Sequence, residues 1–278
     1  MDEIKLLNLN QLHDFANHPF KVEENTELCE LMRSIETEGV LVPLLARPNP
    51  NGEGYELISG HRRKAACAWA GVTDVPVVVR DLDDNQAVIT MVDSNLQREH
   101  IKPSEKAYAY KMKYDAIKKK AGRKNCGQVD HNTGKRSIDV IGELCGDSAK
   151  QVQRYIKMTE LIPALLDKVD DGSMGFTPAV QLSYLKKKEQ QEIIDAMEAT
   201  QCTPSLSQAI RIKKLSEAGK LTESEAEGIL GEIKQKEADR VVFKNEQLYR
   251  FFPSTYTSEQ MRREILEILK SWRNSNWI

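Results

Sequence analysis

Residues 55–71 read Tyr-Glu-Leu-Ile-Ser-Gly-His-Arg-Arg-Lys-Ala-Ala-Cys-Ala-Trp-Ala-Gly. The first four residues alternate in polarity like a short strand, and the small residues of Arg62–Ala70 predict a helix that ends at Gly71. Gly60 therefore lies where a strand passes into a helix. A helix N-terminus offers unpaired N–H groups, and paired arginines add forked donors, which together suit the phosphates of a nucleotide. The alternative interpretation is a surface arginine pair after a structural glycine turn.

Strands and helices alternate on both sides of this stretch. Apolar residues recur at helical spacing before Gly39, and the apolar run Val40–Ala46 predicts a strand. Val75–Val79 is rich in β-branched residues and predicts another strand, and Asn85–Asn95 predicts a helix. Residues 1–101 are therefore expected to form a compact α/β domain in a protein of the α+β class.

The chain becomes purely helical from Ser104, which predicts a second, all-α domain over residues 102–200. Residues 121–136 lack a period and are expected to form a basic linker. Residues 201–278 are expected to form a small, mostly helical C-terminal domain. It contains two capping boxes, Thr222…Glu225 and Thr257…Gln260, and a short strand candidate, Val241–Phe243. The last helix has an apolar stripe that consists of Met261, Ile265, Leu266, Ile268, Leu269 and Trp272.

The charge of the chain is unevenly distributed. The 278 residues include 40 Lys and Arg against 42 Asp and Glu, a net charge of -2. Residues 1–97 hold 8 basic and 16 acidic residues (-8), whereas residues 98–160 hold 15 basic and 8 acidic residues (+7). The basic middle predicts a polyanion site, with a solvated lysine-rich helix as the alternative.

Cellular context follows from what the sequence lacks. No apolar run has the length of a membrane span, so we expect no membrane association and a cytoplasmic protein. The five Cys are scattered, which argues against a disulfide framework or a zinc site. Four histidines have no spacing for a metal site or a catalytic triad and are expected at the surface: His13, His18, His100 and His131.

A helix-turn-helix is predicted within residues 137–157. Gly142 lies four residues before the turn glycine Gly146, and Val152 follows six residues after it, at a position that locks the second helix across the first. The cap and outward face of the second helix are the predicted DNA-binding residues: Ser148, Ala149, Lys150, Gln153, Arg154 and Lys157. Gln can contact an adenine edge, Arg a guanine edge and Lys a phosphate. The alternative is an ordinary helical hairpin with a solvated basic face.

A second candidate phosphate site follows the helix 85–95. Asn95 can bind a phosphate-bound Mg²⁺ through its carbonyl oxygen, and Arg98 can reach a phosphate. The alternative is a helix C-terminus at which Arg98 interacts favourably with the helix dipole.

These motifs, in their order and spacing, resemble the ParB/Spo0J/Noc family of bacterial chromosome and plasmid partition proteins. The resemblance covers roughly residues 17–200 and is carried by Gly60-His61-Arg62-Arg63, Val75–Val79, Asn95–Glu99 and Pro103–Ala107. It implies a ParB/sulfiredoxin-like N-terminal domain that binds CTP with Mg²⁺ and switches a dimeric DNA clamp. It further implies a palindromic double-stranded DNA site, a homodimer and a Walker-type partition ATPase as partner.

Carried over by position, the resemblance assigns nucleotide binding to Gly60, His61, Arg62, Arg63, Asn95 and Arg98, with Asn95 also serving the metal. It assigns no catalytic residue. Two departures matter, because His61 and Ser94 stand where the family usually has Glu. Losing both carboxylates makes hydrolysis doubtful and leaves at most a weak CTPase.

Two other functions remain open from the sequence. One is a helix-turn-helix transcriptional regulator with a degenerate nucleotide pocket. The other is a ParB-like nuclease or phosphotransferase, for which Asp93 and the acids of residues 81–84 are the nearest carboxylates.

Overall fold

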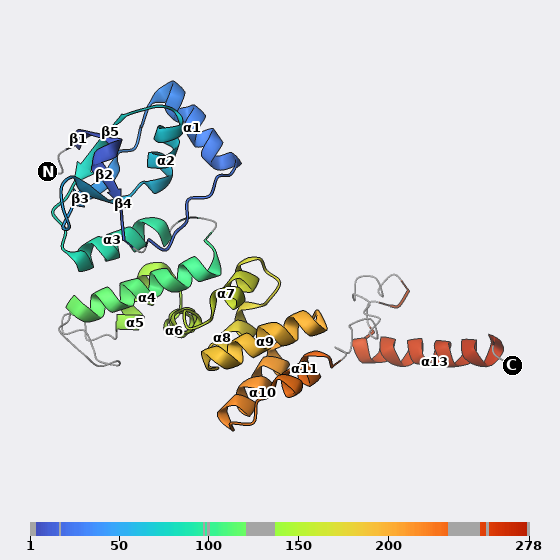
Figure 1. The fold of residues 1–278 in the computed structure, drawn as a ribbon. Coiled ribbons are helices and arrows are strands. Elements are labelled where there is room, and N and C mark those ends of the chain that lie inside the picture. The colour runs from blue at the N-terminus through green and yellow to red at the C-terminus, as the bar shows by residue number, and fades with distance from the viewer. Residues whose placement is uncertain are drawn as a thin grey trace. The chain divides into compact units, whose positions relative to one another are not determined.

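The computed structural model describes residues 4–16, 18–96, 98, 101–120, 137–232, 251–253 and 256–276. The chain forms two compact units, Met1–Gly231 and Glu232–Ile278. Figure 1 shows that the strands of the first unit all lie in its N-terminal part, together with α1, α2 and α3. From α4 onward the described residues of this unit form helices and their connections.

The first unit begins with a five-stranded mixed sheet. Its order is β1 (Ile4–Asn8), β5 (Asp74–Val79), β3 (Leu44–Pro48), β4 (Tyr55–Ser59) and β2 (Leu12–Asp14). The pairs β1·β5 and β3·β4 are antiparallel, whereas β3·β5 and β2·β4 are parallel. A 3₁₀ turn, η1 (Leu9–Gln11), connects β1 to β2. The edge strands β1 and β2 were not predicted from the sequence.

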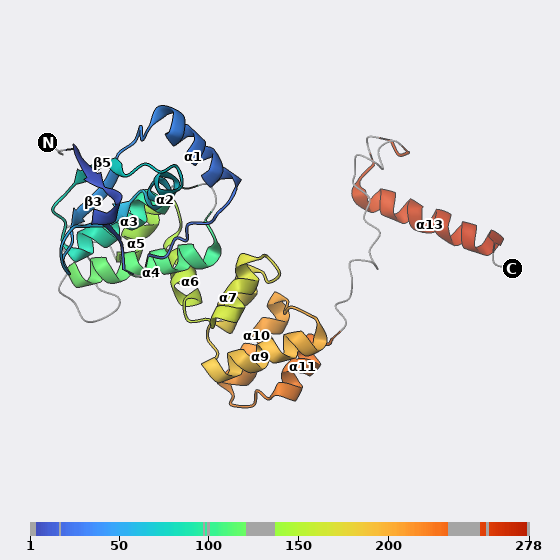
Figure 2. The ribbon, with the colours of Figure 1, turned by 45° about the horizontal axis from the view of Figure 1, so that its top comes forward.

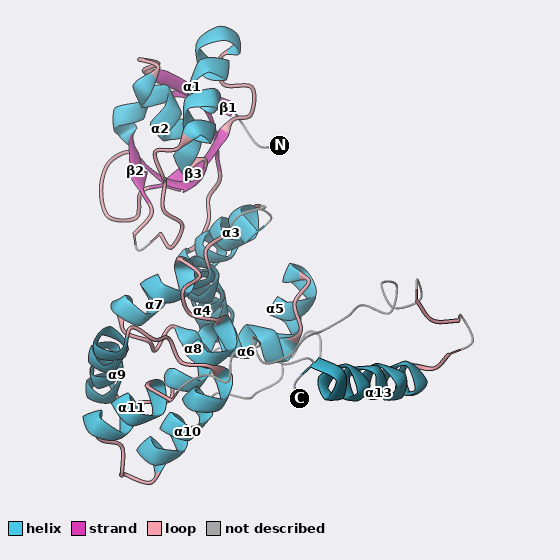
Figure 3. Cartoon of the chain, turned by 90° about the vertical axis from the view of Figure 1, so that its right-hand side faces the viewer, coloured by secondary structure: helices cyan, strands magenta, loops and turns pink. Residues whose placement is uncertain are grey.

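The sheet is covered on both faces. Successive side chains of a strand point to opposite faces, so Leu57 and Ile58 of β4 belong to different apolar clusters. Leu57 packs with residues of α1 (Thr26–Glu38) and α2 (His61–Trp69), and Ile58 packs with residues of α3 (Asp84–Leu96). In Figure 3 the magenta strands lie beside α1 and α2. The helices α2 and α3 therefore pack on opposite faces of the sheet.

The strand predicted over residues 40–46 begins later than expected. Leu41 and Val42 are exposed, and β3 starts at Leu44. The carbonyl oxygens of Val42 and Pro43 accept hydrogen bonds from the Arg63 guanidinium at 2.5 and 2.8 Å. These two residues thus form a loop that contacts the start of α2.

Among the described residues of the first unit, eight further helices follow α3: α4 (Pro103–Lys120), α5 (Ser137–Cys145), α6 (Ala149–Met158), α7 (Pro163–Asp170), α8 (Phe176–Leu182), α9 (Lys187–Thr200), α10 (Leu206–Glu217) and α11 (Glu223–Leu230). Figures 1 and 2 both show α9, α10 and α11 side by side. One apolar cluster extends from Ala107 through Met158 to Leu230. The boundary expected at residue 200 therefore falls inside the unit, because Ser205 caps α10 within a short connection between packed helices.

The second unit contains α13 (Ser258–Asn276). The Thr257 capping box is formed, since Gln260 N donates to Thr257 Oγ1 and Thr257 N donates to Gln260 Oε1. Within the predicted stripe Met261 is buried, whereas Leu266, Ile268, Leu269 and Trp272 are exposed. The strand candidate Val241–Phe243 lies outside the described residues. Across the described ranges no helix combines the length and apolar character needed to cross a bilayer.

Candidate phosphate pocket and helix-turn-helix

Gly60 forms the sharp turn between β4 and α2. Its φ of 108° and ψ of 21° lie in the left-handed region, and a Cβ at this position would lie 2.9 Å from Leu44 Cγ. Both facts require glycine. No side chain caps the N-terminus of α2. The N–H groups of its first turn are therefore available to an anion, as the sequence predicted.

Three arginines converge near this helix end. Arg62 donates to Glu27 Oε2 at 2.9 Å, Arg63 bonds to the loop carbonyls described above, and the Arg98 guanidinium lies 5.7 Å from the centre of the Phe20 ring. Burial lowers the pKa of Arg98, and the positive charges of Arg62 and Arg63 lower it further. The mutual effect of these guanidinium groups indicates concentrated positive potential, which an anion would relieve.

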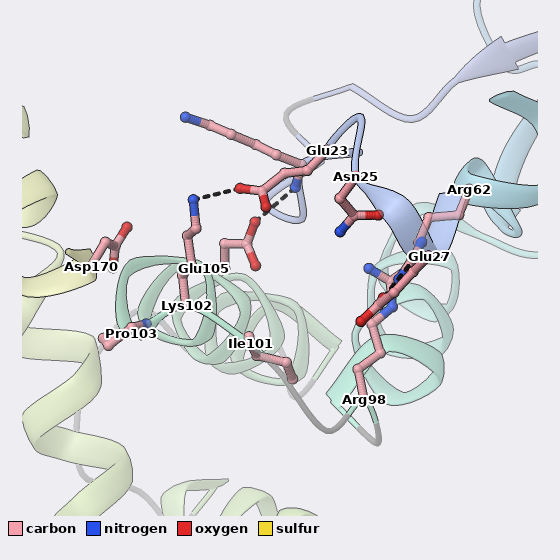
Figure 4. A pocket seen from close by; sticks show the side chains of 11 residues that line it. Glu23, Asn25, Glu27, Arg62, Arg98, Ile101, Lys102, Pro103, Glu105 and Asp170 are labelled. Atoms are coloured by element: carbon pink, nitrogen blue, oxygen red, sulfur yellow. Dashed lines mark hydrogen bonds and ion pairs between the residues drawn. The ribbon is translucent and has the colours of Figure 1, made fainter. Parts of the chain in front are cut away.

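Arg62 and Arg98 line a pocket with a volume of about 720 Å³ (Figure 4). Its other lining residues come from the segment before α1 and the first turn of α1, from the start of α4 and the two residues before it, and from the end of α7: Lys21, Glu23, Asn25, Glu27, Ile101, Lys102, Pro103, Glu105 and Asp170. Figure 4 shows Arg62 and Glu27 facing each other, with Arg98 nearby. The volume lies within the range of small-molecule sites, so a nucleotide fits by size.

Contacts across this pocket connect the sheet domain to the helical region. Glu23 forms an ion pair with Lys102 at 2.5 Å, and Lys21 N donates to Glu105 Oε1 at 2.9 Å. At the start of α4, Ser104 N donates to Asp170 Oδ1 of α7 at 2.9 Å. A ligand in the pocket would therefore touch both parts of the unit.

Asn95 is buried at the end of α3, and its side-chain Nδ2 donates to the carbonyl oxygen of Met91 at 2.7 Å. Ser94 Oγ donates to the same oxygen at 2.9 Å. Mg²⁺ in proteins is usually held by one or two carboxylates together with substrate phosphates. Neither Ser94 nor His61 supplies a carboxylate, and Asp93 is bound to Lys113. The donor set around Asn95 therefore does not fit a Mg²⁺ ion held directly by the protein, and the metal role of Asn95 stays a prediction.

His61 is 7% exposed, and its ring centre lies 3.9 Å from that of His18. Burial lowers the pKa of His61 to about 3, and the neighbouring His18 adds to this effect. Burial also lowers the pKa of His18. His18, expected at the surface, is half-buried, because the segment before α1 brings its ring against His61 at the start of α2.

The helix-turn-helix has the predicted internal geometry. A Cβ on Gly142 would lie 2.5 Å from the Asp147 carbonyl oxygen, so this close approach requires glycine. Gly146 has a positive φ of 71° in the turn, and Val152 is fully buried. Ser148 Oγ accepts from Gln151 N at 3.2 Å and caps α6. The spacing in the sequence thus identified the packing of α5 on α6.

The predicted DNA-binding side chains differ in their solvent exposure and in their contacts with the rest of the protein. Lys150 and Gln153 are exposed, and Ala149 is partly exposed. Arg154 Nη2 donates to Thr177 Oγ1 at 2.8 Å, and its guanidinium lies 5.0 Å from the centre of the Phe176 ring. Lys157 pairs with Glu160 at 2.5 Å. Arg154 is half-buried and connects α6 to α8.

Sequence reasoning missed several residues of these sites. Phe20, Glu27 and Asp147 lie within loops or at the edge of a helix, where no local period marks them. Asp147 Oδ2 accepts from Tyr110 Oη at 2.5 Å and pairs with Lys106 at 2.8 Å, which fixes the turn of the helix-turn-helix on α4. The neighbouring aromatic Tyr184 lies between two lysines, at 4.5 Å from Lys157 and 3.8 Å from Lys213.

The fold and the two sites define a class of protein in which a nucleotide-sized pocket with two arginines, at the edge of a mixed α/β domain, is followed by a basic helix-turn-helix. Residues 1–96 match the family model described as the ParB N-terminal domain. The chain therefore contains a ParB N-terminal domain and resembles the ParB/Spo0J partition proteins.

Curated relatives extend this similarity beyond the N-terminal domain. The chain is 42% identical over 183 residues to the chromosome-partitioning protein Spo0J of Thermus thermophilus, covering 66% of this chain and 61% of that protein. It is 30% identical over 177 residues to the probable chromosome 1-partitioning protein ParB of Deinococcus radiodurans, covering 64% of this chain and 54% of that protein. The chain thus spans somewhat more than half of the length of these relatives.

Two solved structures match parts of this chain. Both are C-terminally truncated ParB from Caulobacter crescentus. The complex with the centromeric parS site has a TM-score of 0.44 and 21% identity, covering 81% of this chain and 98% of that chain. The complex with CTP-γ-S has a TM-score of 0.33 and 23% identity, covering 69% of this chain and 99% of that chain.

Proposed function

We propose that this chain is a ParB-like partition protein that binds DNA sequence-specifically and whose arrangement on DNA is regulated by CTP. It acts as a homodimer on a palindromic double-stranded site, in the cytoplasm and together with a Walker-type partition ATPase. The observation that carries the proposal is the convergence of Arg62, Arg63 and Arg98 on the uncapped N-terminus of α2, within a ParB N-terminal domain.

The proposed roles follow from chemistry. Backbone N–H groups after Gly60 and the guanidinium groups of Arg62, Arg63 and Arg98 bind the triphosphate. The exposed loop residues Leu41 and Val42 border the base. His61 and Asn95, whose side chains are buried, are proposed to serve the phosphate end of the nucleotide. No residue is proposed to catalyse hydrolysis, because the carboxylates that would orient water are replaced by His61 and Ser94.

DNA binding is proposed for α6, with Lys150 and Gln153 exposed toward solvent and Arg154 at its side. The link between the two sites is α4, which packs against α3 of the sheet domain and against α5 and α6. Nucleotide in the pocket would contact Lys102 and Glu105 at the start of this helix. A shift of α4 would thus reach the helix-turn-helix.

Calorimetry on the full chain with CTP, with ATP and with buffer, each with and without cognate DNA, tests this function. We expect CTP to bind, and Arg62→Ala to weaken it by roughly tenfold or more, the loss expected for a charged hydrogen bond to phosphate. The control Arg33→Ala changes an exposed arginine on α1 and should leave CTP binding unchanged. No preference among nucleotides would refute the CTP switch.

The variant Arg154→Ala tests the proposed binding of α6 to DNA. We expect a loss of about 1–3 kcal/mol on the specific site and a smaller loss on random DNA. The control Thr177→Val removes only the partner of Arg154 on α8 and separates lost packing from lost base contact. If Arg154→Ala lost the same binding free energy on specific and on random DNA, Arg154 would contact the DNA phosphate backbone and not a base.

A second function is favoured by a specific observation, namely that Glu27 already occupies Arg62 and that both family carboxylates are missing. This is a helix-turn-helix transcriptional regulator with a degenerate pocket. A footprint confined to one promoter, without spreading when CTP is added, would support the regulator over the partition protein. The nuclease alternative depends on Asp93, whose carboxylate is bound to Lys113.

A further inference from the structure

The lysine-bearing face of α6 continues onto segments that follow the helix-turn-helix. Lys150 and Lys157 are seven residues apart and so lie on one face of α6. The Nζ atom of Lys157 lies 4.5 Å from the centre of the Tyr184 ring, which follows α8. The Nζ atom of Lys213 on α10 lies 3.8 Å from the same ring centre. Two ammonium groups that are far apart in the sequence therefore meet at one aromatic ring.

This ring is open to solvent, since Tyr184 is 51% exposed. The side chains of Lys157 and Lys213 are 26% and 23% exposed, as expected for lysines whose stems pack against the protein. Lys187, at the start of α9, adds a third ammonium group, because its Nζ donates to the backbone carbonyl of Glu160 just after α6. We call Lys157, Tyr184, Lys187 and Lys213 the Tyr184 patch.

Two carboxylates border the Tyr184 patch. Glu160 pairs with Lys157 at 2.5 Å, and Glu217 pairs with Lys213 at 3.7 Å. Both carboxylates are more than half exposed, and such surface pairs are weak and screened by salt. Three lysines share these two carboxylates, so the patch carries excess positive charge and a stronger anion can replace the glutamates.

The position of the patch selects the kind of anion. A recognition helix contacts base edges with its N-terminal residues, and the major groove that it enters is bordered by phosphate strands. Lys157 lies in the last turn of α6, so the patch extends from the end of the helix that points away from the bases. Lysine binds phosphate as a point charge, and tyrosine hydroxyls also contact DNA phosphates.

We propose that the Tyr184 patch is a second DNA-contact surface, which binds phosphates of the duplex backbone beside the groove that α6 enters. The inference rests on the proposed binding of α6 to DNA and extends the DNA footprint to α10. Phosphate contacts carry no direct sequence information, so the patch adds affinity on any duplex and fixes the register of α6.

The variant Lys213→Ala tests the proposal, because Lys213 lies outside the helix-turn-helix. Fluorescence anisotropy on the full chain would measure binding at several salt concentrations to a mixed-sequence duplex and to a duplex that the wild type selects from a random library. We expect weaker binding to both duplexes and a salt slope reduced by about one. Between about 50 and 200 mM salt the wild type should then lose roughly three- to fourfold more affinity than the variant.

The matched control is Lys214→Ala, which removes the same charge from the next position of α10, about 100° around the helix. It should keep the wild-type salt slope. An unchanged slope in Lys213→Ala, or equal changes in both variants, would overturn the proposal. Lys213→Arg keeps the positive charge and should bind like the wild type. If it lost as much as Lys213→Ala, the loss would come from packing and the proposal would fail.

The two proposals fail separately in this experiment. If selection yields no preferred site but Lys213→Ala still lowers the salt slope on mixed-sequence DNA, only the sequence-specific function is lost. If Arg154→Ala weakens binding to the selected duplex while Lys213→Ala binds like the wild type, only the Tyr184 patch is lost. A wild-type chain that binds neither duplex would overturn both.

Discussion

Lys113 of α4 forms an ion pair with Asp93 of α3, and the Lys113 side chain is completely buried. Asp93 is 47% exposed, so the two partners differ sharply in hydration. Asp93 also lies two residues before Asn95 in the sequence. The pair therefore connects the helix that ends at the candidate pocket to the helix that packs on the helix-turn-helix.

Removing either partner should have unequal effects. Asp93→Ala leaves the Lys113 ammonium buried without a counter-ion, and we expect it to lower the free energy of unfolding by about 2–3 kcal/mol, somewhat less than for a fully buried pair. Lys113→Met replaces the cation with an apolar chain of similar length and should cost less than about 1 kcal/mol. Urea denaturation followed by circular dichroism measures both. Lys111→Met on the exposed side of α4 is the control, and equal effects of the first two variants would contradict the argument.

Gly142 should tolerate no side chain. A Cβ would meet the Asp147 backbone oxygen at 2.5 Å, so Gly142→Ala must push α5 away from the turn. We expect a destabilisation of about 1–3 kcal/mol and a matching loss of DNA affinity. The matched control is Gly228→Ala in α11, where a Cβ meets nothing within 4 Å and should stabilise the helix by about 0.5–1 kcal/mol. Thermal unfolding compares the two variants, and an unchanged Gly142→Ala protein would disprove the close approach.

The helix-turn-helix could be predicted because its determinants are local. One short segment contains the three determinants Gly142, Gly146 and Val152. The residue type at each position is required by steric contacts within that segment and does not depend on the rest of the chain. The turn at Gly60 could be predicted for the same reason, since a strand, a left-handed residue and a helix follow one another directly. Composition and spacing therefore predicted the local backbone geometry of both segments, whereas their roles in binding stay predictions.

The remaining features depend on contacts between distant segments. The two edge strands are short, and β1 is defined by its pairing with β5 far along the chain. The ring of His18 reaches His61 only because the intervening sheet and helix bring them together. Likewise, Ile212, which lies beyond the domain boundary expected at residue 200, is buried in the same apolar cluster as Met158, a contact that the local sequence does not indicate. Local periodicity contains no information on such partners.

Glu27 should weaken nucleotide binding. Its carboxylate accepts from Arg62 at 2.9 Å and so occupies a guanidinium that a phosphate would need. Glu27→Gln removes the negative charge, and we expect CTP affinity to increase about two- to fivefold, since exposed ion pairs contribute about 0.2–1 kcal/mol. Calorimetry with CTP measures the change, with Glu36→Gln on the same helix as the control. A decrease in affinity would instead make Glu27 a positioning residue for Arg62.

The turn of the helix-turn-helix should lose stability in acid. Burial alone would raise the pKa of Asp147, but hydrogen bonds from Lys106 and Tyr110 outweigh it, and the pKa of Asp147 lies below its ordinary value. The unfolded chain therefore binds a proton at a higher pH than the folded protein does. The stabilisation by Asp147 is fully present above the unfolded pKa of about 3.9 and is lost as the pH falls through the lower folded pKa. Asp147→Asn should consequently show a flatter dependence of unfolding free energy on pH between pH 5 and pH 3 than the wild type, as the midpoint in urea would measure. Asp167→Asn, at an exposed position on α7, provides the comparison. If Asp147→Asn followed the wild-type pH dependence, the carboxylate would not be what holds this turn on Tyr110 and Lys106.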